Sequence, residues 1–84
     1  MKYRSRTEII ADILRSVNDT GDATKTKIMY KAFLSYTQLK EYLILLTGDD
    51  LLKYDATTQT FRITKKGHDF MKAYNQIEEA MNLE

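Results

Sequence analysis

Residues 24–46, TKTKIMYKAFLSYTQLKEYLILL, carry the pattern that decides the fold. Thr24 can cap a short helix, and Ser35 followed three residues later by Gln38 is a capping-box pattern that opens another helix. Because almost no chain is left between the two segments for a loop, the helices must turn sharply against each other, which is the helix-turn-helix layout. Apolar residues recur at helical spacing in both, and we expect these to face inward: Ile28, Met29 and Ala32 in the first helix, and Tyr36, Leu39, Leu43 and Leu46 in the second.

A further helix is predicted upstream of this pair. Ser5 and Glu8 form an S-x-x-E capping box ahead of an apolar run. Residues 18–22, NDTGD, are turn formers, so we expect this helix to end near Val17. Its apolar residues draw a single stripe: Ile9, Ile10, Ile13, Leu14 and Val17.

Downstream of residues 48–50, GDD, the apolar period changes from about 3.6 to 2. Leu52 and Tyr54 alternate with Lys53, and Phe61 and Ile63 alternate with polar residues on either side. The polar stretch 55–59, DATTQ, separates the two runs and contains no glycine. The pattern predicts a β-hairpin with a loop of about five residues rather than a tight two-residue turn.

A last helix is predicted to begin at Thr64, which can serve as its cap. We expect Phe70 and Met71 to pack on the domain, whereas residues 74–81 have nothing left in their own chain to cover them. The order helix, helix, helix, hairpin, helix predicts one α+β domain. The apolar residues of the last helix recur at spacings of 4, 3 and 4, as at the a and d positions of a coiled coil: Phe70, Tyr74, Ile77 and Met81.

The formal net charge of the 84 residues is only +1, but the charges are unevenly distributed. Between Asp22 and Glu41 there are four lysines and no acid. A one-sided cationic surface attracts a phosphate backbone whatever the net charge. The alternative is a solvated lysine face without a ligand. Residues 1–40 hold eight of the thirteen basic residues: Lys2, Arg4, Arg6, Arg15, Lys25, Lys27, Lys31 and Lys40.

Other function classes find little support. The chain has no cysteine, which excludes disulfides and thiolate metal sites, and it has three glycines with no glycine-rich phosphate loop. His68 has no neighbouring group that would make a nucleophile or a zinc site. No apolar run has the length of a signal peptide or a membrane span. We therefore expect a cytoplasmic protein that is not an enzyme and needs no cofactor. If the cationic surface binds DNA, the protein is expected to be nucleoid-associated.

Residues 24–54, continued by TFRITKKGHDF at 60–70, resemble the small archaeal winged helix-turn-helix DNA-binding family. That family includes the coiled-coil-dimerised 10a-type chromatin proteins of Sulfolobus and related transcription regulators. The most specific parts are LSYTQLKEYL at 34–43 and the T-x-K-G of Thr64–Gly67, which resembles the junction between the wing and the last helix. The resemblance implies a winged helix-turn-helix fold, with three helices, a β-hairpin wing and a C-terminal helix. It also implies duplex DNA binding and antiparallel pairing of the C-terminal helices.

Two departures from the family pattern bear on these expectations. The family commonly has a glycine just before the Leu-Leu that starts the wing, whereas Asp50 stands there in this chain and Gly48 comes two residues earlier. Aspartate tolerates the left-handed conformation at some cost. The last helix, about twenty residues or about 30 Å long, is also shorter than the coiled coil of the chromatin type. Any dimer arm is correspondingly small.

A recognition helix in this layout presents its outer face to the major groove. Glutamine can bind adenine, lysine can reach guanine or a phosphate, threonine can meet a thymine methyl, and glutamate can accept from cytosine. Gln38 has a competing role in its capping box, and the tip of the wing, which has one acid and no basic residue, is not expected to be a main contact. The predicted base-reading residues are Thr37, Gln38, Lys40 and Glu41. The predicted phosphate contacts are Arg4, Arg6, Lys25, Lys27, Lys31, Lys53 and Arg62.

The predicted organisation is a winged helix-turn-helix domain over residues 1–69 and a dimerising end of the last helix over residues 70–84. Two apolar residues, Ile44 and Leu45, lie beside the buried stripe of the third helix, and at least one of them is expected to meet another surface. Near-neutral charge and the tip of the wing leave one alternative open, a winged helix that binds a partner protein without binding DNA. The predicted dimer contacts are Tyr74, Ile77, Met81, Ile44 and Leu45.

Overall fold

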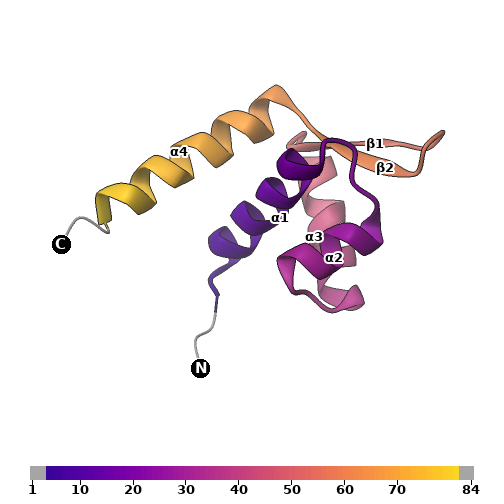
Figure 1. Ribbon diagram of the computed structural model, residues 1–84, viewed down its shortest axis with the longest axis horizontal. Coiled ribbons are helices and arrows are strands. Elements are labelled where there is room, and N and C mark those ends of the chain that lie inside the picture. The colour runs from indigo at the N-terminus through magenta and orange to yellow at the C-terminus, as the bar shows by residue number, and fades with distance from the viewer. Residues whose placement is uncertain (1–3, 82–84) are drawn as a thin grey trace.

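A computed structural model describes residues 4–81 of the chain, and Figure 1 shows its elements. Helices α1, α2 and α3 form the body of the domain, the hairpin projects from one side of it, and α4 runs beside α1 and away from the hairpin. Within the described residues no helix is long and apolar enough to cross a membrane. The elements in order are α1 (Arg6–Thr20), α2 (Lys25–Ala32), α3 (Tyr36–Gly48), β1 (Leu52–Asp55), β2 (Thr60–Ile63) and α4 (Lys65–Met81).

The predicted caps of the first three helices are present, and Thr64 accepts a hydrogen bond from the N–H of Gly67 at the start of α4. Ser5 and Glu8 form the complete capping box at α1, and Ser35 and Gln38 form the one at α3. The hydroxyl of Thr24 accepts a hydrogen bond at 3.2 Å from the backbone N–H of Lys27. Each hydroxyl satisfies a donor that the first turn of a helix would otherwise leave unpaired. The boundaries at the starts of these helices therefore follow directly from the sequence.

The end of α1 was predicted wrongly. The helix continues through the turn formers to Thr20, three residues beyond Val17. It ends at Gly21, whose φ of +92° is open to glycine and whose N–H donates to the carbonyl of Val17 at 2.8 Å. Asn18, Asp19 and Thr20 can adopt the helical conformation of the last turn, so α1 ends only at Gly21.

The core lies between the three helices, the hairpin and the start of α4, and it contains most of the predicted inward residues. Two tyrosines are exceptions, because Tyr54 of the hairpin is 45% exposed and Tyr36 is 55% exposed. Tyr36 occupies the first position of α3, at the edge of the domain, where the Lys25 ammonium lies 5.9 Å from the ring centroid. The expectation that Tyr36 faces inward was wrong. The fully buried large residues are Ile13, Leu14, Val17, Ile28, Leu39, Leu46 and Leu52.

The hairpin is antiparallel, with Leu52 paired to Ile63 and Tyr54 paired to Phe61. Its loop spans four residues, 56–59, one fewer than predicted, and a positive φ of 57° at Gln59 takes the part that a glycine would usually take. A further pairing was not predicted. Ala23, between α1 and α2, exchanges two backbone hydrogen bonds with Phe61, at 3.0 and 2.7 Å, and so ties the hairpin to the helices.

The T-x-K-G motif is a packed junction between the hairpin and α4. The hydroxyl of Thr64 donates to the carbonyl of Asp50 at 2.6 Å and accepts from the N–H of Gly67 at 2.9 Å. A Cβ on Gly67 would overlap the carbonyl oxygen of Leu51, so only glycine fits there without movement. Asp50 has a φ of +63°, which confirms that aspartate holds the left-handed position expected for it.

Helix α4 packs on α1 through a stripe that only partly coincides with the predicted one. Met71 is buried in the core and Phe70 packs against it, as predicted. Farther along, the Arg15 guanidinium of α1 hydrogen-bonds Asn75 at 2.7 Å and Glu78 at 2.9 Å. Consequently Met71, Asn75 and Glu78 face α1. Each follows by one residue a member of the apolar series that was expected to form the dimer seam.

Candidate nucleic-acid interface

The outer face of α3 presents Thr37, Lys40, Glu41 and Ile44, which are all exposed. Their spacing of 3, 1 and 3 places them on one side of the helix, opposite the buried leucines. Gln38 is also exposed, but its amide oxygen lies 3.3 Å from both the N–H and the hydroxyl of Ser35. Its competing role in the capping box, predicted from the sequence, is therefore present.

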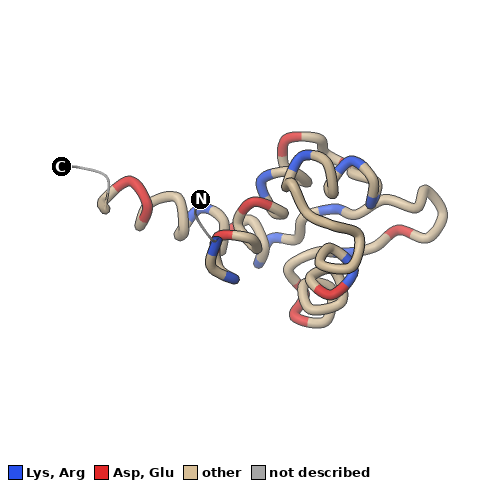
Figure 2. Tube along the Cα trace, turned by 90° about the horizontal axis from the view of Figure 1, so that it is seen from below, with Lys and Arg blue, Asp and Glu red and all other residues tan. Residues whose placement is uncertain are grey.

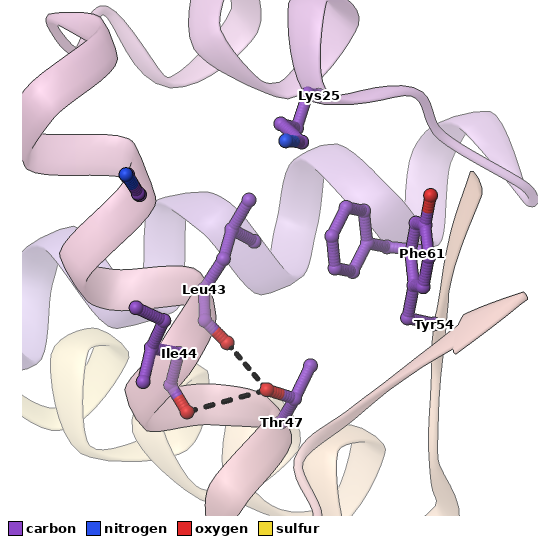
Figure 3. Close-up of a pocket in the computed structure, with 7 residues that line it drawn as sticks. Lys25, Leu43, Ile44, Thr47, Tyr54 and Phe61 are labelled. Carbon is purple, nitrogen blue, oxygen red and sulfur yellow. Dashed lines mark hydrogen bonds between the residues drawn. The ribbon is translucent and has the colours of Figure 1, made fainter. Parts of the chain in front are cut away.

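A groove of about 380 Å³ lies between this face of α3 and the hairpin (Figure 3). Leu43, Ile44, Tyr54 and Phe61 supply apolar walls, and the side chains of Lys25 and Lys40 also line it. The hydroxyl of Thr47, another lining residue, donates to the carbonyl of Leu43 at 2.8 Å within its own helix. The groove is thus apolar inside, carries two ammonium groups and has no acidic lining residue within the described part of the chain.

The four lysines between Asp22 and Glu41 do not share one surface. Lys25 and Lys40 meet at the groove, whereas Lys31 lines a separate hollow with Asp12 and Asp19 of α1. Since an α-helix turns once in about 3.6 residues, Lys27 lies on the Lys31 side of α2. Acids from elsewhere in the sequence accompany this second group, and Figure 2 shows basic and acidic positions interleaved over the helices. In the folded chain, the lysines of residues 23–40 are therefore divided between two surfaces.

Arg4 is used within the domain. Its guanidinium donates to the Asp12 carboxylate at 2.9 Å and to the carbonyls of Ala32 and Phe33 at 2.6 and 2.8 Å. These carbonyls end α2, so Arg4 neutralises the negative end of that helix and fixes the turn into α3. Phe33, in this turn, has a left-handed φ of 55° and is 84% exposed. The phosphate contact predicted for Arg4 stays a prediction.

Arg62 also has an acidic partner. Its Nε and a terminal nitrogen donate to the two carboxylate oxygens of Asp22 at 2.9 and 3.2 Å. The hydrogen bond to Arg62 lowers the pKa of Asp22, and the same bond raises the pKa of Arg62. Lys53 lies directly opposite Arg62 in the hairpin and is exposed. Lys53 and Arg62 line a separate hollow together with Tyr54, Asp55 and Ala56, and Arg62 is already bound to a carboxylate.

Arg6 lies on the other side of α3. Its guanidinium carbon is 6.0 Å from the ring centroid of Tyr42, and the two line a hollow together with Glu41 and Leu45. Leu45 and its neighbour Ile44 therefore belong to different surfaces, although both are predicted dimer contacts. The lining of neither surface includes a residue of α4.

The far end of α4 leaves apolar side chains uncovered. Ile77 is 58% exposed and Met81 is 73% exposed. Tyr74 is half-buried against Arg15, whose guanidinium carbon lies 5.7 Å from the ring centroid. Burial raises the pKa of the Tyr74 hydroxyl, and the Glu78 carboxylate raises it further. Residues 82–84, part of the segment predicted to dimerise, lie outside the described residues.

Sequence reasoning missed the groove. Its floor combines residues from α3 and the hairpin that are far apart in the chain, and Tyr54 and Leu43 were assigned only to the core pattern. One signal could have found part of it. Ile44 follows Thr37 by seven residues and Lys40 by four, so helical spacing alone places it on the outer face. Within residues 4–81 no group of three or more His, Cys, Asp or Glu could hold a metal ion.

Comparison with known proteins agrees with this architecture. Residues 3–82 match the winged helix-turn-helix family. An uncharacterized protein of Methanocaldococcus jannaschii is 29% identical over 79 residues, which cover 94% of this chain and 78% of that protein. The crystal structure of Sso10a-2, a DNA-binding protein from Sulfolobus solfataricus, has a TM-score of 0.78 and 25% identity, covering 93% of this chain and 85% of that one. The predicted α+β fold and archaeal resemblance are confirmed, and the chain belongs to the winged helix-turn-helix family.

Proposed function

We propose that this protein binds duplex DNA as a homodimer, with α3 in the major groove, and acts as a transcription regulator or chromatin-associated protein rather than as an enzyme. It would work in the cytoplasm, on the nucleoid. The observation that carries the proposal is the groove between α3 and the hairpin, where Lys25 and Lys40 stand beside the exposed face of the recognition helix. The family and the DNA-binding neighbour support it.

Thr37, Lys40 and Glu41 are the proposed base-reading residues, because they are exposed at the beginning of α3, the part of a recognition helix that reaches base edges. Gln38 is a weaker candidate, since its amide oxygen is held by Ser35. Phosphate contacts position the helix but carry no sequence information. Among the predicted phosphate contacts, Arg4, Lys31 and Arg62 adjoin acids of their own chain. Arg6 and Lys53 also line hollows with an acid, Glu41 and Asp55, whereas the groove lined by Lys25 has no acidic lining residue among those described. Lys25 is therefore the strongest proposed phosphate contact, and the other six predicted residues stay proposals.

Amide NMR spectra test this placement. We expect a duplex of about 20 bp, about two helical turns, added at about 50 mM salt, to shift residues 36–44 and 52–63 most. Residues 70–81 on α4 should shift little, which gives an internal control. A Lys40→Ala variant should show the same shifts only at higher DNA concentration. Shifts concentrated on α4 would contradict the placement.

The second candidate function is a winged helix that holds a partner protein. It is favoured by the hairpin loop, residues 56–59, which contains no cation, and by Phe33, whose ring is largely exposed in the turn before α3. Exposed aromatic side chains are common anchors of protein interfaces. The absence of any spectral change with duplex DNA at low salt would favour this function over DNA binding.

The proposed dimer forms through the end of α4, over residues 74–81, within the dimerising segment 70–84. Ile77 and Met81 are exposed on the side that includes Tyr74, and burial between two copies would remove them from water. We expect Ile77→Lys to convert the dimer to a monomer, because it places an ammonium in an apolar seam. Solution mass by light scattering measures this, and Gln76→Lys, exposed one residue away, is the matched control. A dimer that persists in Ile77→Lys would exclude this seam.

A further inference from the structure

We propose that Ile44 contacts the 5-methyl group of a thymine in the major groove and so gives the protein a preference for A·T base pairs at that step. The inference rests on the proposed DNA binding and adds a specificity-determining residue to it. Ile44 is 65% exposed, whereas Leu39, Leu43 and Leu46 of the same helix are buried. Because most of its surface is exposed, Ile44 is not part of the core of its own domain.

The surroundings of Ile44 define what it can contact. It shares the groove with the ammonium groups of Lys25 and Lys40, and the rings of Phe61 and Tyr54 form the opposite wall. An occupant must therefore bring an apolar group close to negative charge. Duplex DNA has this combination, because the thymine methyl is the apolar group on the floor of the major groove and phosphates line its edges.

The position of Ile44 along α3 separates its contact from those of the other outward residues. It lies seven residues after Thr37, which is about 10 Å along the helix axis. The two side chains therefore contact different base pairs. Cytosine carries hydrogen in place of the methyl group and purines have none, so an apolar contact there distinguishes thymine from the other bases.

The alternative role of Ile44 in the dimer has less support from its location. The groove that it lines contains no residue of α4, where the exposed apolar side chains Ile77 and Met81 lie. A second copy of the chain would also have to cover Lys25 and Lys40. Burying these two ammonium groups would be costly, because no acidic residue lines the groove to pair with them among the residues described. Charge favours a polyanion as the occupant.

The test removes only the methyl group. Binding is measured to a duplex of alternating A and T and to the same duplex with uracil in place of every thymine, each about 20 bp long. Wild-type protein should bind the uracil duplex about threefold to tenfold more weakly, the effect of one or two lost methyl contacts. Ile44→Ala should bind both duplexes equally, with the affinity that the wild type has for the uracil duplex.

Two further variants complete the design. Ile44→Val should keep most of the methyl dependence, and Leu45→Ala, on the neighbouring surface of α3, should keep all of it. Equal binding of both duplexes by the wild type, or full methyl dependence in Ile44→Ala, would overturn the inference and leave DNA binding intact. A change of oligomeric state in Ile44→Ala without methyl dependence in the wild type would overturn it in favour of the dimer contact. Failure to bind either duplex would instead remove the proposed function.

Discussion

Replacing Gly67 by alanine is expected to lower the free energy of unfolding by about 2–3 kcal/mol, the usual cost of a side chain forced into a filled space. A Cβ there would overlap the carbonyl oxygen of Leu51 and approach Cγ1 of Ile63 to 3.0 Å. The same oxygen accepts hydrogen bonds from the N–H and the hydroxyl of Thr64. Because the obstacle is hydrogen-bonded backbone, the start of α4 must move away from the domain to relieve it.

The sign of this effect makes it informative. An alanine usually stabilises the interior of a helix relative to glycine, by up to about 1 kcal/mol. Gly48→Ala in α3 is the matched control, because a Cβ there meets no atom within 4 Å. Urea unfolding followed by circular dichroism should show a lower midpoint for Gly67→Ala and an equal or slightly higher one for Gly48→Ala. An unchanged midpoint for Gly67→Ala would mean that the junction is looser than the structure has it.

The helix starts, the hairpin and the order of the elements could be predicted from the sequence because local chemistry determines them. A serine or threonine cap acts on an N–H three residues away, so Ser5, Thr24 and Ser35 fix their boundaries within one turn of chain. The change of apolar period from helix to strand is equally local. The resemblance to the winged-helix family depended instead on particular stretches of sequence, chiefly residues 34–43 and the T-x-K-G of Thr64–Gly67.

Contacts between distant segments could not be predicted in the same way. Arg4 bonds the carbonyls that end α2, twenty-eight and twenty-nine residues along the chain, and nothing in its sequence neighbourhood distinguishes it from a free cation. The pairing of Ala23 with Phe61 and the ion pair of Arg62 with Asp22 also join residues far apart in the chain, so the sequence pattern does not show them. Tyr36 fits the helical period of α3 but lies beyond the edge of the core, which the period does not show.

In the candidate site, too, the features set by local sequence could be predicted and the contacts between distant segments could not. Exposure of Thr37, Lys40 and Glu41 follows from the helical period. The lysine-rich run was interpreted as one face, whereas Lys25 and Lys31 lie in different hollows once α1 and the hairpin are in place. The acids of α1 that accompany Lys31 come from a segment that precedes the run. Charge in the sequence therefore indicated a cationic surface but not which lysines compose it.

The dependence of DNA affinity on salt, measured for Lys25→Ala/Lys40→Ala beside the wild type, tests the central claim most directly. Each phosphate neutralised by a cation releases counterions and adds about 0.9 to the slope of log affinity against log salt. Removing both groove lysines should make that slope shallower by about one to two and weaken binding about 10- to 100-fold at about 0.1 M salt.

The control is Lys65→Ala/Lys72→Ala, which removes the same charge from exposed positions on α4, away from the groove lining. We expect it to keep the wild-type slope, because α4 contributes no residue to the groove. Non-specific attraction alone would instead lower the slope equally in both variants. A steep slope that both variants share with the wild type would contradict DNA binding through the groove between α3 and the hairpin. A slope reduced only when Lys25 and Lys40 are lost is the result that the proposed interface predicts.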